Sequence, residues 1–279
     1  YAIGIDVGGT TVKYGLFQEN GKCVDRHAHP TAADAGYERL IDELAEEIPA
    51  LYKKHQLNPN QIIGVGIGLP GPVINDSTIS VGVNISLEEE LNMGKVLTKR
   101  INLPVIVAND ANVAALGEQW QGAGSKHNSL VLFTLGTGVG GGVVIDGKII
   151  SGTNGSGGEL GHMPILEEPS QRTCGCGSKS CLEIMCSATG IKAQVRELLE
   201  ASDEPSTLRN YNGHYDARAV FSAARNGDKL SMEIVETTSY HLGKACAVIA
   251  AVVDPELFVI GGGVSNAGDL LLEPTRAHY

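Results

Sequence analysis

The sequence predicts an α/β fold of two lobes, each built on a mixed sheet. The chain has 279 residues, and domains commonly hold about 150 residues, so two domains are expected. Strand-like and helix-like hydrophobic patterns alternate along the chain. A strand, a glycine-rich turn and a second strand open the sequence, and the same unit recurs at residues 129–150. This recurrence indicates an internal repeat.

The first lobe, residues 1–117, opens on a strand, YAIGIDVGG, and an alternating second strand, TVKYGLFQ. Apolar residues then recur at helical spacing, which predicts a helix over Gly36–Gln56. Two buried strands follow, IIGVGIGLPG and LPVIVAND, and a helix is expected from Ala111 to about Gln121. The loop QGAGSKHN is rich enough in small and polar residues to separate two domains, and we expect a hinge near Gly117–Gly124.

The second lobe, residues 118–279, begins with SLVLFTLGTGVGGGVVIDGKII, which is predicted to form strand, glycine turn and strand. Helices are expected from about Ser187 to Ala201, over Ala217–Arg225 and over Lys229–Val253. A last strand, ELFVI, runs into the glycine string GGGVS. A cysteine-rich loop precedes the first of these helices.

Composition and charge exclude some classes of binding partner for this protein. The net charge of −11 argues against nucleic acid and membrane surfaces, which select basic faces. It does not argue against ATP, which needs only a local nest of N–H groups and a metal ion. The longest apolar run, near Ala245–Val253, is too short to span a bilayer. No charged-then-apolar leader precedes the first strand at Tyr1, so a cytoplasmic location is expected, where six cysteines do not indicate a disulfide framework.

The first glycine turn, in GIDVGGTTVK, has the composition of a phosphate-binding hairpin. Glycines let the chain double back with free N–H groups, and the following hydroxyls and ammonium add donors. The candidate phosphate ligands are Gly8, Gly9, Thr10, Thr11 and Lys13. Asp6 closes the strand and could hold magnesium directly or through water. Equally, Asp6 could cap its own turn in an ordinary hairpin.

A second glycine string, LGTGVGGGVV, contains Gly136, Thr137 and Gly138. It matches G-x-G-x-x-G, but a strand follows where a dinucleotide-binding motif requires a helix. No G-x-x-x-x-G-K-[ST] motif occurs, so P-loop chemistry is excluded. Together with a third string, Gly261, Gly262 and Gly263, the two hairpins predict a nucleotide held between the lobes.

Asn109 and Asp110 lie where a buried strand meets a helix, a position that presents side chains to a cleft. Both residue types are also favoured helix N-caps, so the pair could simply cap the helix. A carboxylate that faces a phosphate clamp is what an alcohol-phosphorylating enzyme requires, because the hydroxyl must lose its proton. A positioned base of this kind contributes ~10²–10⁴-fold to the rate.

Cys174, Cys176 and Cys181 form C-x-C-x₄-C, and His162 lies twelve positions before the first of them. Three thiolates and an imidazole make a closed tetrahedral zinc site of the structural kind. The alternative is three free thiols in a glycine-rich loop, which would be chemically awkward. The remaining cysteines, Cys23, Cys186 and Cys246, stand apart and are expected to be ordinary small apolar residues.

Glu159 and Glu183 flank this cluster. A zinc-bound histidine keeps a second ring nitrogen that can meet a ligand. With Asn109 and Asp110, the two glutamates could surround a polyol with hydrogen-bonding groups, although they could also be surface residues.

Together these stretches resemble the ROK family (repressors, unassigned reading frames and sugar kinases) of the actin, hexokinase and heat-shock ATPase superfamily. The resemblance runs from GIDVGGTTVK through VANDANVAALGE and GTGVGGGVVIDGKIISGTNGSGGELGHM to FVIGGGVS, nearly the whole chain. It implies a two-lobed actin/hexokinase-like (ribonuclease H-like) fold with a duplicated mixed-sheet domain and an interdomain cleft. Within the family the sequence is most similar to zinc-containing bacterial glucokinases, which implies transfer of the γ-phosphate of ATP, with Mg²⁺, to glucose.

The resemblance also implies roles for particular residues. Asp110 would be the base for the 6-hydroxyl of the sugar. Asn109, Glu159, His162 and Glu183 would hold the other hydroxyls, and Gly68 would approach the sugar through its backbone. The ATP phosphates would meet Gly8, Gly9, Thr10, Thr11, Lys13, Gly136, Thr137 and Gly138, and the adenosine would lie near Gly261, Gly262 and Gly263. His162, Cys174, Cys176 and Cys181 would bind structural Zn²⁺, so His162 would serve both metal and sugar.

Sugar binding would bring the lobes together before transfer, which keeps water from accepting the phosphate. A homodimer or homotetramer is implied as well. The sequence departs from the family pattern at Ser180, where glycine is usual, and this small change is expected to leave the zinc loop intact. Family members usually continue to a final helix that packs on the first lobe. Either that tail lies outside this sequence, or the first lobe is less well buttressed than usual.

Other readings compete with glucose phosphorylation. The same side chains could surround another hexose, such as fructose, allose or N-acetylmannosamine. Sugar-sensing regulators of the family carry a helix-turn-helix domain ahead of the first hairpin, for which the sequence offers no counterpart before Tyr1. A non-catalytic sugar-binding protein is disfavoured because Asp6, Asp110 and the glycine strings are intact.

Overall fold

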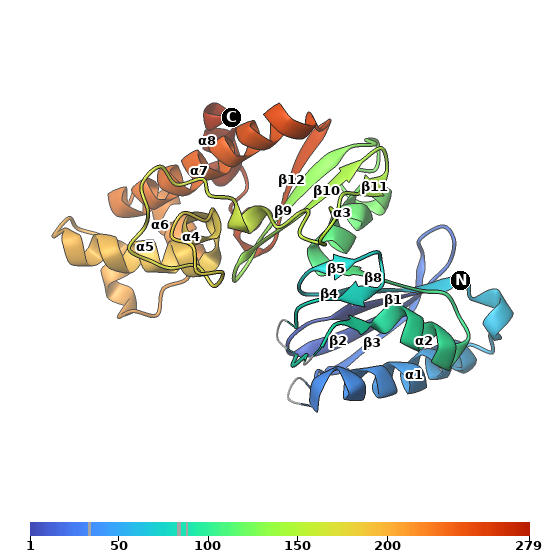
Figure 1. Cartoon of the computed structure of the whole chain (residues 1–279). Coiled ribbons are helices and arrows are strands. Elements are labelled where there is room, and N and C mark those ends of the chain that lie inside the picture. Colours follow the sequence, from blue (N-terminus) through green and yellow to red (C-terminus); the bar gives the residue numbers. More distant parts are fainter. Residues whose placement is uncertain (33–34, 83–84, 88) are drawn as a thin grey trace. The chain divides into compact units, whose positions relative to one another are not determined.

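The computed structural model describes residues 1–32, 35–82, 85–87 and 89–279. The chain forms two compact units: unit 1 comprises Tyr1–Gly122 and Lys148–Gly157, and unit 2 comprises Ala123–Gly147 and Gly158–Tyr279 (Figure 1). The predicted boundary after residue 117 falls inside a helix that continues to Gln121. In the structure, the first part of unit 1 ends after this helix, at Gly122. The segment 148–157 also belongs to unit 1, although its place in the sequence suggested the second lobe.

Unit 1 contains most of the strands. These are β1 (Ala2–Val7), β2 (Thr11–Phe17), β3 (Cys23–Pro30), β4 (Gly64–Leu69), β5 (Val73–Ile74), β6 (Thr78–Ile79), β7 (Leu91–Asn92), β8 (Val105–Asn109) and β11 (Lys148–Ile149). Its helices are α1 (Gly36–Lys54), η2 (Pro59–Gln61), α2 (Met93–Ile101) and α3 (Asp110–Gln121). The helices predicted over Gly36–Gln56 and from Ala111 are confirmed to within two residues at each end.

The main sheet of unit 1 has the order β3-β2-β1-β4-β8. β1 and β2 form the predicted antiparallel hairpin, in which Asp6 is opposite Lys13. β1 is parallel to β4, and β4 is parallel to β8. The sheet is therefore mixed, and the carboxyl ends of its three parallel strands meet at one edge.

One apolar stripe of α1 packs on this sheet. Leu40, Ile41, Leu44 and Ile48 are at most 4% exposed and join the core formed by the inward side chains of β1 and β2. α2 adds Met93 and Leu97 to the same core, and both helices lie along one face of the sheet (Figure 1). The 3.6-residue spacing of these apolar positions was the local signal for α1.

Unit 2 contains fewer strands and more helix. Its strands are β9 (Leu130–Leu135), β10 (Val139–Ile145) and β12 (Leu257–Gly261). Its helices are η3 (Leu160–His162), α4 (Glu183–Cys186), α5 (Ala188–Ala201), η4 (Thr207–Tyr211), α6 (Ala217–Arg225), α7 (Lys229–Val253), η5 (Gly263–Ala267) and α8 (Asp269–His278). Side-chain caps at Ser187, Asp216 and Asp228 start α5, α6 and α7, which explains why the predicted starts agree with the structure.

The strands of unit 2 repeat the pairing found in unit 1. β9 and β10 are antiparallel, and β12 runs parallel to β9. The same relations connect β1 with β2 and with β4. The internal repeat predicted from the two glycine hairpins is therefore confirmed as a duplicated supersecondary unit.

The apolar residues of α7 are used within the core of unit 2. Ile234, Leu242 and Ile249 of this helix are at most 7% exposed and join a cluster that includes Val131 and Phe133 of β9. Among the described residues, none of the helices has both the length and the apolar character needed to cross a membrane.

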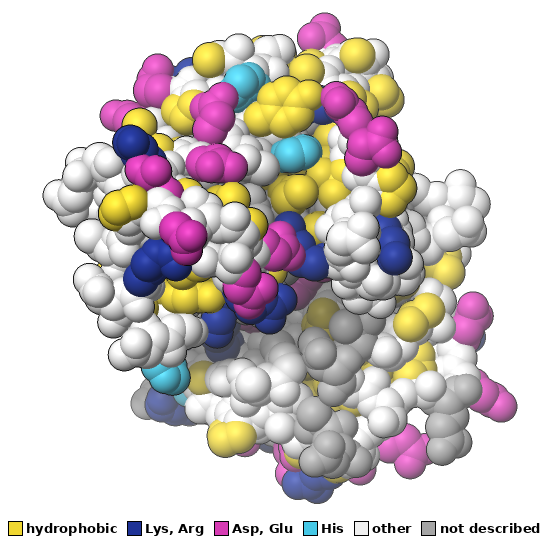
Figure 2. Space-filling view, turned by 90° about the vertical axis from the view of Figure 1, so that its left-hand side faces the viewer, with side chains coloured by type: hydrophobic (Ala, Val, Ile, Leu, Met, Phe, Trp, Pro, Cys, Tyr) yellow, Lys and Arg dark blue, Asp and Glu magenta, His cyan; other side chains and the backbone are white. Residues whose placement is uncertain are grey.

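Charges of both signs are mixed on the surface that Figure 2 presents, where Lys and Arg side chains are interspersed among Asp and Glu side chains. Unit 2 pairs Lys229 with Glu204 at 2.9 Å and Lys244 with Glu167 at 2.8 Å. Exposed pairs of this kind contribute only about 0–1 kcal/mol each to stability.

Candidate functional site

The first hairpin turn is closed by its own backbone. Gly8 N–H donates to the Thr11 carbonyl at 2.9 Å, and the Thr31 hydroxyl donates to the Gly8 carbonyl at 2.7 Å. Lys13 Nζ lies 2.8 Å from Asp6 Oδ2, with both side chains about half exposed or more. The turn therefore presents an exposed ammonium beside an exposed carboxylate, while the Gly8 donor is used inside the turn.

Asp6, Gly68 and Asp110 come together at the carboxyl edge of the parallel strands. Asp6 is opposite Gly68 in the β1–β4 ladder, and Gly68 is opposite Ala108 in the β4–β8 ladder. A Cβ atom on Gly68 would lie 3.5 Å from Asp110 Cα. These three residues are far apart in the sequence. The parallel pairing of the strands brings them together.

Asn109 is the N-cap of α3. Its Oδ1 accepts the N–H of Asn112 at 3.1 Å, and its Nδ2 donates to the Gly71 carbonyl at 3.2 Å. The side chain is 9% exposed. The capping alternative is thus realised for Asn109, which leaves Asp110 as the first residue of the helix.

Burial raises the pKa of the Asp110 carboxyl above its ordinary value, and the charge of Asp6 adds to the increase, whereas the hydrogen bond from Ala111 N–H opposes it. That bond measures 2.8 Å to Oδ1. A carboxylate whose charged form is partly desolvated accepts a proton more readily. Its environment suits a general base.

The second hairpin turn is held by the start of α5. Ala188 N–H donates to the Gly136 carbonyl at 2.8 Å, and the Thr189 hydroxyl donates to the Thr137 carbonyl, also at 2.8 Å. A Cβ atom on Gly138 would lie 2.4 Å from Glu183 Oε2, so this position requires glycine unless the glutamate moves. The turn lines a cavity of about 350 Å³ together with Arg172, Gly175 and Gly190.

The third glycine string turns the chain from β12 into η5. Gly262 has φ of +82°, and a Cβ atom there would lie 2.5 Å from the Leu135 carbonyl oxygen, so only glycine fits. A second cavity, of about 490 Å³, lies between η5 and α6 and is lined by Gly263, Asn266, Phe221 and Arg218, among others.

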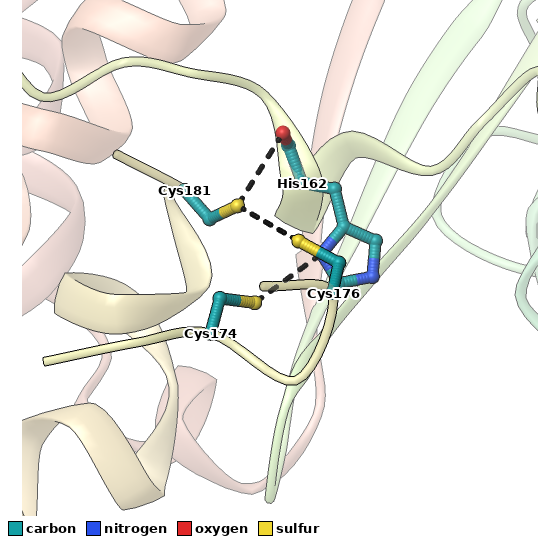
Figure 3. A group of neighbouring side chains, drawn as sticks. All are labelled: His162, Cys174, Cys176 and Cys181. Atoms are coloured by element: carbon teal, nitrogen blue, oxygen red, sulfur yellow. Dashed lines mark hydrogen bonds between the residues drawn. The ribbon is translucent and has the colours of Figure 1, made fainter. Parts of the chain in front are cut away.

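His162, Cys174, Cys176 and Cys181 converge, and their ligand atoms all lie within 4.8 Å of one another (Figure 3). Cys174 Sγ is 3.4 Å from His162 Nδ1, and Cys176 Sγ is 3.4 Å from Cys181 Sγ. Ligands of a tetrahedral zinc with bonds of about 2.0–2.3 Å are separated by roughly 3.3–3.8 Å. The four side chains therefore fit a zinc ion.

The backbone of the cysteine loop is ordered around this cluster. Cys174 N–H donates to the Ser178 carbonyl at 2.8 Å, and Gly177 has φ of +88°. Ile165 N–H donates to the Ser180 carbonyl at 2.9 Å, which ties the backbone at Ser180 to the segment that follows His162. Arg172 anchors the start of the loop, because its Nη1 donates to the carbonyls of Ile184 at 2.6 Å and Gly190 at 3.0 Å.

Each of the two predicted glutamates lies near one member of the cluster. Glu159 Oε2 is 4.0 Å from His162 Nε2, the ring nitrogen that faces away from Cys174. Glu183 Oε2 accepts Val139 N–H at 2.9 Å, and Glu183 Oε1 accepts from Cys174 Sγ at 3.2 Å. Glu183 thus connects the second hairpin to the cysteine loop, a placement that its sequence neighbours did not predict.

Two further residues support these groups and were missed in the sequence. Arg172 holds the cysteine loop, and Asn112 occupies the first turn of α3. The Asn109–Asn112 spacing was a usable signal, since an N-cap and the third helical residue meet through the cap hydrogen bond.

Comparison with known proteins shows which family the chain matches. The family model described as "ROK family" matches residues 2–279. A glucokinase from Halalkalibacterium halodurans is 40% identical over 280 residues, covering 99% of this chain and 84% of the relative.

Two solved structures extend the comparison. A ROK hexokinase from Thermus thermophilus has a TM-score of 0.80 at 30% identity, covering 99% of this chain and 88% of that one. A ROK family glucokinase from Streptomyces griseus, in complex with glucose and AMPPNP, has a TM-score of 0.73 at 30% identity with the same coverage. The two-lobed α/β fold, the duplicated hairpins and the family match lead to one conclusion: this chain belongs to the ROK family.

Proposed function

We propose that this chain is an ATP-dependent glucokinase that transfers the γ-phosphate of ATP to the 6-hydroxyl of glucose, with Asp110 as the general base. The observation that carries the assignment is the position of Asp110 at the carboxyl edge of the parallel strands, next to Gly68 and within the field of Asp6. The similarity to glucokinases, one of them solved with glucose and a nucleotide, supports both substrates.

In the proposed reaction the 6-hydroxyl donates its proton to an oxygen of Asp110. The hydroxyl oxygen forms a bond to the γ-phosphorus as the bond to the β,γ-bridging oxygen breaks, and ADP leaves with that electron pair. Mg²⁺, for which Asp6 offers a carboxylate ligand, supplies charge neutralisation on the phosphates when bound. Lys13 lies within 2.8 Å of the same carboxylate and can add positive charge there.

The nucleotide is assigned to the glycine strings. In this proposal the phosphates meet Gly8, Gly9, Thr10, Thr11 and Lys13, with Gly136, Thr137 and Gly138. Gly8 contributes by shaping the turn, because its N–H donates to the Thr11 carbonyl. The cavity of about 490 Å³ between η5 and α6, at Gly263, supports the placement of the adenosine near Gly261, Gly262 and Gly263.

The sugar hydroxyls other than the reactive one are assigned to Asn109, Glu159, His162 and Glu183, with Gly68 approaching through its backbone. His162 supports this proposal because its Nδ1 faces Cys174 while Nε2 faces Glu159. Zinc held by His162, Cys174, Cys176 and Cys181 would fix the imidazole in that orientation. A homodimer or homotetramer remains a prediction from family resemblance.

A coupled ADP-release assay across a hexose panel tests the function. We expect turnover with ATP and Mg²⁺ and the highest kcat/KM for glucose, because glucokinases are among the chain's relatives. A preference for fructose, allose or N-acetylmannosamine would change the assigned substrate. The absence of turnover with any hexose would overturn the assignment as a kinase.

The pH dependence of kcat/KM tests the role of Asp110. Burial raises the pKa of this carboxyl, so it becomes protonated, and inactive as a base, at a pH above the ordinary aspartate value of about 3.9. Activity should therefore fall as the pH is lowered through that raised pKa. The residual activity of Asp110→Asn should lack this acidic limb. An acidic limb at or below the ordinary aspartate value would contradict the assignment.

A further inference from the structure

Asn112 is a buried side chain in the same helical turn as Asp110. It lies two residues after the proposed base and is 3% exposed. Its backbone N–H donates to Asn109 Oδ1 at 3.1 Å, and its side-chain Nδ2 donates to the carbonyl of Gly157 at 3.2 Å. The start of α3 is thus bound to a segment 45 residues further along the chain.

The segment that Asn112 holds belongs to unit 1 and contacts it closely. β11 packs beside α3 (Figure 1). A Cβ atom on Gly155 would lie 2.5 Å from the Val73 carbonyl oxygen, outside the segment. Within the segment itself, a Cβ atom on Gly157 would lie 2.3 Å from the Ile150 carbonyl oxygen. Such approaches are possible only for glycine. Asn112 supplies an anchor from the helix.

Gly157 is the last residue of this segment in unit 1, and Glu159 follows two residues later. Two residues of chain span at most about 7 Å. A hydrogen bond on the Gly157 carbonyl therefore restricts where the chain that carries Glu159 and His162 can begin.

We infer that Asn112 is a positioning residue for the hexose, which connects the helix of the base to the segment that leads into Glu159 and His162. This inference rests on the proposed function. Asn112 touches neither substrate; it acts through the Gly157 carbonyl. Its loss should therefore weaken hexose binding more than nucleotide binding, because the nucleotide is assigned to the glycine strings.

The surroundings of Asn112 bear on whether its replacement would affect folding stability as well as hexose binding. Among the described residues, its Oδ1 is buried without a hydrogen-bond partner. An unpaired buried acceptor destabilises a fold. Asn112→Ala removes one hydrogen bond and leaves the Gly157 carbonyl without this donor, but it also removes the unpaired acceptor, which offsets part of the lost stability. The melting temperature is therefore measured beside the kinetics.

The test compares Asn112→Ala with the wild-type chain by steady-state kinetics. We expect the KM for the hexose to rise about tenfold or more, equivalent to about 1.4 kcal/mol, while the KM for ATP stays within about twofold. Asn112→Asp, which has the same shape but lacks the donor when ionised, should give a similar increase. In the double variant with Gly157→Ala, which displaces the same segment, the increases should not add.

Ser239→Ala is the matched control. Ser239 is fully buried, and its hydroxyl donates to the Leu271 carbonyl at 3.3 Å, within the packing of α7 and α8. The Ser239→Ala substitution removes a comparable buried hydrogen bond and should leave the hexose KM unchanged. A hexose KM for Asn112→Ala within twofold of wild type, or a fall in kcat that merely follows a lower melting temperature, would overturn the inference. A wild-type chain that phosphorylates no hexose would instead refute the proposed function.

Discussion

Replacing Asp110 with asparagine should lower kcat by ~10²–10⁴-fold and leave hexose binding nearly intact. Asparagine has the shape of aspartate and can occupy the first position of α3, so the fold around Gly68 should persist. An amide cannot accept the hydroxyl proton, however, and only this step is lost. Turnover is measured by coupled ADP release, and hexose affinity by titration calorimetry.

Asp42→Asn provides the control for this experiment. Asp42 is an aspartate of α1 whose side chain is 52% exposed and paired with Arg100. It lies outside the groups assigned to either substrate, so its replacement should leave kcat unchanged. If Asp110→Asn lost less than about tenfold in kcat, Asp110 would not be the base, given the contribution expected of one.

Removal of one cysteine ligand should have the second large effect. Cys181 is fully buried, and its Sγ lies 3.4 Å from Cys176 Sγ. We expect Cys181→Ser to lose the zinc, to lower the melting temperature and to abolish turnover. Structural zinc binds zinc-finger peptides with about 10–16 kcal/mol of apparent free energy. Even part of that is comparable with the ~5–15 kcal/mol that stabilises a typical domain.

Metal analysis of the purified chain, with its melting temperature, measures this effect. The wild type should hold about one zinc per chain. Cys186→Ser is the matched control, because Cys186 is also fully buried but lies outside the cluster and donates to the Thr238 carbonyl at 3.4 Å. A serine hydroxyl can make the same bond, so this variant should keep its zinc. A wild-type chain that is active without zinc would refute a required metal.

The convergence of His162 with the three cysteines illustrates a prediction that local sequence carries well. The spacing C-x-C-x₄-C places three ligands in one short loop, and the structure brings His162 to them. Helices with strong caps and regular apolar spacing were equally accessible, as the agreement for α6 and α7 shows. Short strands such as β5 and β6, two residues each, carry no periodic signal and were missed. The polar alternation of β3 concealed that strand as well.

The role of Asp110 was open in the sequence, where a cap and a base were both consistent with a strand-to-helix junction. The structure separates the two roles: Asn109 makes the cap bond, and Asp110 is left with a partly buried carboxyl. The parallel pairing of β1, β4 and β8 brings Asp6 and Gly68 to the edge at which Asp110 lies.

By itself, the sequence determined the features that arise within a few residues: helix caps, glycine turns, the cysteine spacing and the repeated hairpin. Only the tertiary structure decided which distant residues meet. It joined the segment 148–157 to unit 1 through glycine contacts, bound Gly157 to Asn112, and set Glu183 between Val139 and Cys174. The physical reason is that turns and caps are stabilised by neighbouring backbone groups, whereas strand pairing and close backbone approach depend on partners supplied by remote parts of the chain.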